Sequence, residues 1–173
     1  ISVVCTVSGP LYLHYNTNAS CGTDGSCHTG VVQCTSCAGA PDPCSSITTL
    51  VCANSVTAAL TGPGLWSPGS CGFSTPGTEK IYSFTAAATG VHTLQVTSTS
   101  STGFIDYFYK AASGGCNATG WTCIDDIFSP ATATIGTLTA GTTYYILLDP
   151  ETTSAVSHTF MINCPAAFDP CAS

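Results

Sequence analysis

The sequence is poor in charged residues, and positive charge is especially scarce. Charged residues make up 6% of the 173, the only basic ones are Lys80 and Lys110, and the formal net charge is −7. Proteins that bind nucleic acid through its phosphates, or that dock on anionic lipid, need clustered Lys and Arg. Both kinds of partner are therefore excluded. No apolar run approaches the roughly 18 residues of a transmembrane helix, so we expect no membrane insertion.

Strong helix formers are also scarce, whereas strand formers are abundant. Arg is absent and Met occurs once, while the chain contains 28 Thr and 20 Ser. Apolar and polar residues alternate with the period of a strand, and Gly/Pro clusters separate the segments. The strands expected with most support are 80–85, 90–97, 104–110, 142–148 and 157–164; weaker candidates are 47–52, 56–60 and 132–138. Many short strands of this kind predict an all-β fold, a disulfide-rich β-sandwich or jelly roll.

Cysteine is the most informative residue type in the composition. The chain contains 12 cysteines, an even number. They are Cys5, Cys21, Cys27, Cys34, Cys37, Cys44, Cys52, Cys71, Cys116, Cys123, Cys164 and Cys171. Such a number predicts up to six disulfides and an oxidising compartment, hence a secreted, extracellular or cell-surface protein. Because the chain begins at Ile1 and shows no signal peptide, we expect a mature, processed product.

Zinc or thiol redox chemistry is the alternative for the C-x-x-C at Cys34 to Cys37, but the α/β context of redox proteins is missing. Disulfide pairing is favoured. Six cysteines lie within 44–164 and six elsewhere, so each group has the even number that internal pairing requires. Cys116 and Cys123 close a short loop and are the expected pair. Cys171 is expected to link back to the N-terminal segment, in the same subunit or in a neighbour.

The chain divides into three expected parts. Residues 1–43 form a cysteine-rich N-terminal extension, 44–164 a β-sandwich domain, and 165–173 a C-terminal tail. The tripeptide Asp42-Pro43-Cys44 recurs as Asp169-Pro170-Cys171. This repeat is either chance or the start of another module copy.

Several segments of the domain match a known family in order. They are Asp42-Pro43-Cys44 with Ile47, Leu50 and Cys52; Cys71; Ile81 to Ala86 with Thr89-Gly90-Val91; Asp106 with Tyr109; Cys116, Cys123 and Asp125-Asp126; and Leu138 to Ile146. Together they resemble the bacterial pre-peptidase C-terminal domain, a β-sandwich module of large secreted and surface proteins. Ile124 stands where the family often has Asn, and Ile81 where it has Trp. The resemblance implies a non-catalytic module for adhesion, carbohydrate or matrix binding, or assembly.

Three aspartates are candidate metal ligands. The resemblance places Asp106 on a strand and Asp125 and Asp126 on a neighbouring loop. Clustered carboxylates suit Ca²⁺, which takes six to eight oxygen ligands. The alternative is that Asp125 and Asp126 form Asx turns in a solvent loop and that Asp106 is exposed.

Catalysis has little support in the sequence. No G-x-S-x-G motif is present, and the mid-strand histidines His92 and His158 are more typical of structural positions. Asp106, Asp149 and Glu151 could be assigned to a glycosidase pair, but nothing distinguishes them. The protein is therefore not expected to be an enzyme.

Two features of the sequence bear on glycans. The aromatic residues Trp66, Trp121, Tyr107, Phe108 and Tyr109 form either a sugar-stacking platform or part of the core. Asn18 and Asn117 lie in N-glycosylation sequons, which matter only in a source that modifies asparagine.

The favoured function is a structural subunit of an extracellular filament or cell-surface assembly. The N-terminal residues Ile1, Ser2, Val3 and Val4 would add a strand to the sheet edge of another copy. Head-to-tail contacts of this kind build open fibres. The alternative is a monomeric adhesion or carbohydrate-binding module of a larger secreted protein. Expected partners are copies of the chain itself and, in the alternative, glycans.

Overall fold

The structure is a computed structural model that describes residues 40–100 and 102–166. These residues form two β-sheets and two short 3₁₀ helices, with no α-helix among them, which confirms the predicted all-β fold. The 3₁₀ helices are η1 (Pro43–Ser46) and η2 (Ala112–Gly114). The strands are β1 (Thr48–Leu50), β2 (Val56–Leu60), β3 (Lys80–Thr85), β4 (Gly90–Thr99), β5 (Ile105–Ala111), β6 (Thr122–Ile127), β7 (Ala131–Leu138), β8 (Thr143–Pro150) and β9 (Val156–Asn163).

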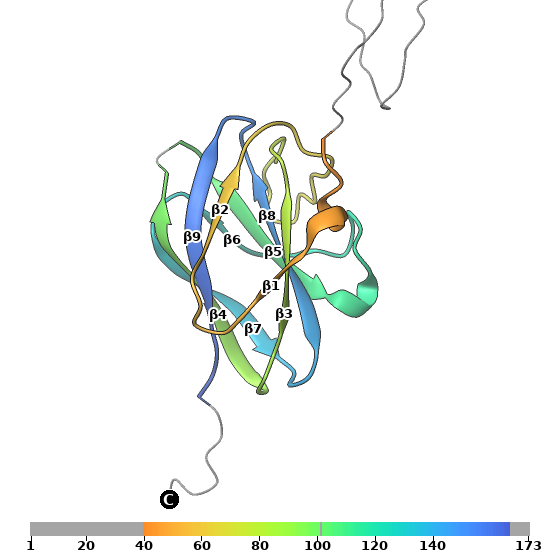
Figure 1. The fold of residues 1–173 in the computed structure, drawn as a ribbon, viewed down its shortest axis with the longest axis vertical. Helices are drawn as coiled ribbons and strands as arrows, with labels where there is room; N and C mark the ends of the chain where they lie inside the picture. Colours follow the sequence, from red (N-terminus) through yellow and green to blue (C-terminus); the bar gives the residue numbers. More distant parts are fainter. Residues whose placement is uncertain (1–39, 101, 167–173) are drawn as a thin grey trace, which may run out of the picture. The chain divides into compact units, whose positions relative to one another are not determined.

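The two sheets pack face to face as a β-sandwich (Figure 1). The five-stranded sheet has the order β1-β3-β8-β5-β6, and the four-stranded sheet has the order β2-β9-β4-β7. All pairings are antiparallel except that of β1 with β3. Because side chains alternate between the two faces of a strand, each sheet has an inner face toward its partner and an outer face.

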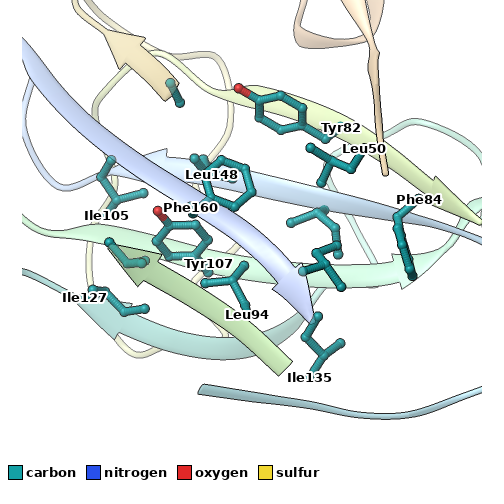
Figure 2. Close-up of a cluster of buried hydrophobic side chains, with 14 of the residues drawn as sticks. Leu50, Tyr82, Phe84, Leu94, Ile105, Tyr107, Ile127, Ile135, Leu148 and Phe160 are labelled. Carbon is teal, nitrogen blue, oxygen red and sulfur yellow. The ribbon is translucent and has the colours of Figure 1, made fainter. Parts of the chain in front are cut away.

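The inner faces form the main hydrophobic core (Figure 2). The five-stranded sheet contributes side chains such as Tyr82, Tyr107 and Leu148, and the four-stranded sheet contributes Leu94 and Phe160. The Phe160 ring meets both tyrosines edge-on, at centroid distances of 5.3 and 5.7 Å. Burial of this apolar surface is the dominant favourable term that holds the sheets together.

One polar contact is built into this core. The Tyr107 hydroxyl and His158 Nδ1 lie 3.0 Å apart, and their rings stack at 6.0 Å. Burial without a compensating charge lowers the pKa of His158 to about 4. His158 is therefore neutral at neutral pH and cannot be reached by a substrate.

The outer face of the five-stranded sheet is covered by the chain itself. Its buried side chains Ile81, Phe108 and Leu147 form a second cluster, joined by half-buried Trp66 and Cys71. Those last two residues belong to the segment 61–79 between β2 and β3, which we call the crossing segment. The crossing segment is anchored to β6 through the Cys71–Cys123 disulfide. One face of this sheet thus acquires a roof, and polar groups beneath it lose contact with water.

A glycine permits the close approach of this roof. A side chain on Gly77 would lie 2.4 Å from the carbonyl oxygen of Thr152 and 2.7 Å from Cβ of Pro150. The Gly77 amide instead donates to the Pro150 carbonyl oxygen at 3.0 Å. The absence of a side chain therefore brings the crossing segment onto the end of β8.

The disulfides confirm that the cysteines of 44–164 pair among themselves, but not the pair that was predicted. All six cysteines of 44–164 pair with one another, as Cys44–Cys116, Cys52–Cys164 and Cys71–Cys123. The expected Cys116–Cys123 bridge was wrong, because Cys116 and Cys123 are each joined to a residue more than 50 positions away in sequence. Cys71–Cys123 ties the crossing segment to β6, and Cys44–Cys116 ties η1 to the segment between η2 and β6.

Other predictions concern residues outside those described. They are the cysteines before residue 40 and Cys171, the assembly residues Ile1 to Val4, and the sequon at Asn18; all stay predictions. The proposed division of the chain at residues 43 and 164 also stays a prediction. Within residues 40–166, no helix is long and apolar enough to cross a membrane.

Candidate functional site

Three carboxylates from three separate segments meet on the outer face of the five-stranded sheet. Asp106 on β5 pairs directly with Asp126 on β6. Glu151 follows β8, and its amide donates to the Phe104 carbonyl oxygen just before β5. One oxygen from each of the three side chains lies within 4.8 Å of the others. We call Asp106, Asp126 and Glu151 the acidic site.

The acidic site holds buried oxygens that have no hydrogen-bond partner. Asp106 is 0% exposed, and in the ionised form neither of its carboxyl oxygens has a hydrogen-bond partner; one oxygen each of Asp126 and Glu151 is in the same state. A buried carboxylate without a partner is costly. Burial, then repulsion from Asp126 and Glu151, and then a hydrogen bond that the protonated group donates to Asp126 together raise the pKa of Asp106 to about 7. Burial likewise raises the pKa of Asp126 and of Glu151. The site favours whatever supplies positive charge.

The two lysines of the chain do not supply positive charge to the acidic site. The Lys80 ammonium group donates to the carbonyl and hydroxyl oxygens of Ser46. Lys110 shares a strand face with Asp106, but four residues of strand separate them by about 13 Å. Its ammonium group donates to the carbonyl oxygens of Asn117 and Thr119 and lies 4.5 Å from the Trp121 ring centroid. The negative charge of the acidic site is thus uncompensated within the described residues.

Two further carboxylates extend the acidic site under the crossing segment. Asp149 on β8 pairs with Asp106 across the sheet and is 0% exposed. Its Oδ2 accepts a hydrogen bond from the Thr75 hydroxyl at 2.8 Å, whereas its Oδ1 has no partner. Burial, with repulsion from Glu79 and Asp106, raises the pKa of Asp149 to about 8. Buried Glu79 accepts from the amides of Leu65 and Trp66, which fixes the roof above it.

This geometry suits a hard divalent cation. Ca²⁺ binds carboxylate and carbonyl oxygens at 2.3–2.6 Å and takes six to eight of them. The acidic site offers three carboxylates from a rigid sheet, and its unpartnered oxygens are free to bind a cation. A bound Ca²⁺ would be held by Asp106, Asp126 and Glu151, with Asp149 behind them. The residues present therefore fit the predicted cation.

Two of the three predicted metal ligands lie on a different element from the one expected. Asp125 and Asp126 lie on strand β6, not on a loop. Because neighbouring residues of a strand point to opposite faces, Asp126 faces Asp106 while Asp125 is exposed and outside the group of three. The Asp125 carboxylate instead accepts a hydrogen bond from the Asp126 amide at 3.0 Å. Glu151 was not predicted as a ligand, because its place in the site depends on β8 lying beside β5 in the sheet order.

The other candidate residues are mostly buried. Tyr107 and Phe108 are 0% exposed and Trp121 is 7% exposed, so these members of the predicted sugar-stacking platform belong to the two hydrophobic clusters. Asn117 is exposed, and its side-chain oxygen accepts from the amide and hydroxyl of Thr119. Glycosylation of Asn117 stays a prediction.

Similarity to known proteins is found among solved structures. No protein-family model and no curated protein sequence matches the chain. Among solved structures, the pre-peptidase C-terminal domain of a collagenase from Bacillus anthracis is similar. It has 11% sequence identity and a TM-score of 0.47, and the match covers 68% of this chain and 95% of that domain.

Proposed function

We propose that residues 40–166 form a non-catalytic, calcium-binding β-sandwich module of a secreted protein. The observation that carries this proposal is the acidic site, in which the fully buried Asp106, when ionised, has no hydrogen-bond partner for either carboxyl oxygen. A bound Ca²⁺ would replace the missing partners and would lock β5, β6 and the end of β8 together. The three disulfides support an extracellular location, because such bonds form and persist in oxidising compartments.

The same residues give little support to catalysis. Acid–base chemistry needs a titratable group that a substrate can reach. His92 and His158 are both 0% exposed, and the most perturbed carboxyls, Asp106 and Asp149, are equally buried. Their raised pKa values are explained by burial and mutual repulsion, which fits a cation site.

Calcium titration of the full chain tests the module proposal. After treatment with a chelator, calorimetry should detect one Ca²⁺ per chain, and the melting temperature should rise when Ca²⁺ is restored. Asp106→Asn should abolish both effects. Asp125→Asn is the matched control, because Asp125 is the exposed neighbour on the opposite face of β6, and it should bind Ca²⁺ like the parent. Equal loss in both variants, or no binding by the parent, contradicts the proposal.

A second candidate function is assembly into an extracellular filament or cell-surface structure. Strand β1 lies at one edge of the five-stranded sheet and pairs only with β3. A largely apolar hollow beside it is lined by Leu50, Val51, Cys52, Phe84 and Cys164, and Val51 is 61% exposed. An open edge with an apolar groove can accept an extended peptide. We propose the predicted segment Ile1 to Val4 of another copy as the occupant; the alternative is a module that remains monomeric and serves in adhesion or carbohydrate binding.

Electron microscopy of the native chain tests assembly. Regular fibres should form, and they should be lost both on deletion of residues 1–4 and in Val51→Asp. Val91→Asp, which changes a similarly exposed valine (55%) on the other sheet, should assemble normally. Isolated particles at every concentration would rule out the filament and leave the monomeric module.

A further inference from the structure

Lys110 is a buried lysine whose partners among the described residues carry no charge. It lies near the end of β5 and is 7% exposed. Its ammonium group lies 3.1 Å from the side-chain oxygen of Asn117, 3.0 Å from the carbonyl oxygens of Asn117 and Thr119, and over the Trp121 ring. Burial of this uncompensated charge lowers the pKa of Lys110. The neutral amine, which is a nucleophile, is therefore more accessible than in an exposed lysine.

The Asn117 side chain is held beside this amine as an oriented amide. Its Oδ1 accepts from the Thr119 amide at 3.0 Å and from the Thr119 hydroxyl at 3.1 Å, and its Nδ2 donates to the Gly114 carbonyl oxygen at 3.0 Å. Two donors at such distances resemble an oxyanion hole, which stabilises the negative charge that develops on a carbonyl oxygen under attack. The Trp121 indole donates to the Asn117 carbonyl oxygen at 2.9 Å, and neighbouring Cys116 is fixed by its disulfide. One anchored loop thus brings a nucleophile, an electrophile and oxyanion donors together.

We propose that Lys110 and Asn117 become joined by an intramolecular isopeptide bond once the chain has folded. After the ammonium group releases a proton to solvent, Nζ attacks Cγ of Asn117, and the carbonyl electron pair moves to Oδ1 beside the Thr119 donors. When this pair returns, the Cγ–Nδ2 bond breaks, and Nδ2 takes one proton from Nζ and leaves as ammonia. Asn117 is exposed, so the ammonia can escape. This inference is independent of the calcium proposal.

The fold supplies what free lysine and asparagine lack. Well-oriented groups within one molecule can react as though each were present at about 10⁵ M or more. The released ammonia is diluted into solvent, which disfavours the reverse reaction. A neutral amide also replaces a buried ammonium group and so removes its desolvation cost. The bond would tie the loop between η2 and β6 to strand β5.

Two alternatives make different predictions about the mass of the chain. A lysine that stays charged and only holds the loop leaves the mass unchanged. N-glycosylation of Asn117 adds mass, because a sugar is attached to Nδ2. The isopeptide bond lowers the mass, because ammonia is lost.

Mass spectrometry and trypsin digestion of the reduced full chain test the bond. The mass should lie about 17 Da below that of the sequence, which is the mass of one ammonia. Trypsin cleaves after Lys and Arg, and Lys80 and Lys110 are the only such residues in the chain. Because the bond blocks cleavage after Lys110, the digest should contain residues 1–80 and 81–173. A chain without the bond gives residues 81–110 and 111–173 as separate peptides.

Replacement of each lysine provides a matched pair of variants. Lys110→Arg keeps the positive charge but has no amine that can form this bond, so it should show the full mass and normal cleavage after position 110. Lys80→Arg is the control, since the Lys80 ammonium group donates to the carbonyl and hydroxyl oxygens of Ser46 and to no side-chain amide. It should keep both the mass loss and the blocked cleavage.

Variants of Thr119 test the oxyanion donors while both reacting side chains remain. Thr119→Val should slow the appearance of the mass loss during refolding about 100-fold, as loss of one oxyanion donor does. Thr119→Ser, which keeps the hydroxyl, should restore the rate. Equal rates in these two variants would overturn the role assigned to the hydroxyl.

The inference is overturned by a full-length mass with normal cleavage after Lys110, or by a mass loss that persists in Lys110→Arg. A loss of ammonia with normal cleavage would also overturn it, because a succinimide at an asparagine gives that combination. A sugar mass on Asn117 would overturn it as well. None of these outcomes bears on Ca²⁺ binding by the acidic site.

Discussion

The outer faces of the two sheets differ sharply in chemistry. The four strands of the four-stranded sheet contain no Asp, Glu, Lys or Arg. Their outward side chains satisfy one another, as in the hydroxyl pair Thr57–Thr159 at 2.9 Å and the Asn163–Gln95 amide contact at 3.2 Å. The five-stranded sheet instead places Asp106, Asp126 and Asp149 on its outer face. There the roof removes water while leaving carboxyl oxygens unpartnered.

This difference shows which face of the module lowers the stability of the fold. An outward row of Thr and Asn is ordinary for a sheet face in water. A row of buried carboxylates destabilises the cation-free fold, and disulfides and the roof must offset that cost. The four-stranded sheet is therefore a scaffold, and the covered face of the five-stranded sheet is where binding is expected.

Removal of the roof's anchor should have the largest effect. Cys71→Ser/Cys123→Ser should lower the free energy of unfolding by about 2–4 kcal/mol and weaken Ca²⁺ binding, because the crossing segment is no longer tied to β6. Chemical denaturation with and without Ca²⁺ measures both effects. Cys52→Ser/Cys164→Ser should cost a similar amount of stability but keep Ca²⁺ affinity, since that bridge lies beside the main core. Equal Ca²⁺ affinities in the two double variants would contradict this account.

A side chain at Gly77 should have the next largest effect. Gly77→Val would collide with the backbone at Thr152 and with Pro150. The crossing segment would have to shift away from β8, at a cost of about 1–3 kcal/mol. Thermal unfolding measures the loss. Gly114→Val is a control for glycine replacement, since no atom lies within 4 Å of the added carbon and the φ angle of Gly114 is not positive; a Gly77 variant as stable as this control would show that the close approach is not required.

The cation-free protein should lose stability as pH rises from about 6.5 to 8.5. Burial raises the pKa of Asp106 to about 7 and that of Asp149 to about 8. In this range the folded state binds protons that the unfolded state has released, so the free energy of unfolding falls with increasing pH, by about 1 kcal/mol per pH unit. Denaturation midpoints in chelator measure the slope, and Asp106→Asn should reduce it. A free energy of unfolding that stays constant or rises with pH in chelator would contradict the claim that these carboxylates are uncompensated.

His158 should give the free energy of unfolding the opposite pH dependence at lower pH. Its folded-state pKa of about 4 lies below the ordinary value of 6.5. Between these values the unfolded state gains a proton that the folded state refuses, so stability falls as pH decreases. The carboxylate slope is therefore read above pH 6.5, where the contribution of His158 to the pH dependence fades.

The smallest effect is expected on the uncharged sheet. Thr57→Val removes one partner of an exposed hydroxyl pair and keeps the β-branched shape. The free energy of unfolding should change by no more than about 0.5 kcal/mol, with Ca²⁺ affinity unchanged. A loss as large as that of the Gly77 variant would show that this face is not a passive scaffold.

Much of the fold could be predicted from the sequence because strand alternation is local. The expected strands 80–85 and 56–60 match β3 and β2, and the other predicted strands differ at their ends by no more than a few residues. Strand β6 was missed because Asp125-Asp126 is typical of a turn. Its pairing with β5 overrides that local preference.

The candidate site could be predicted only in part. Asp106 and Asp126 were among the predicted ligands, and the structure brings them together, whereas Asp125 is turned away by the alternation of β6. Glu151 joins the site because β8 lies beside β5 in the sheet order, and no local pattern reports that order. Disulfide pairing was missed for the same reason, since Cys44–Cys116 and Cys71–Cys123 each join segments that lie more than 50 residues apart in sequence.

A crystal structure of the full chain grown in Ca²⁺, with anomalous scattering used to locate the ion, tests the central claim most directly. The account predicts one Ca²⁺ with oxygens of Asp106, Asp126 and Glu151 at 2.3–2.6 Å. The absence of an anomalous peak at these three side chains, or an ion bound by Asp125 instead, would contradict it.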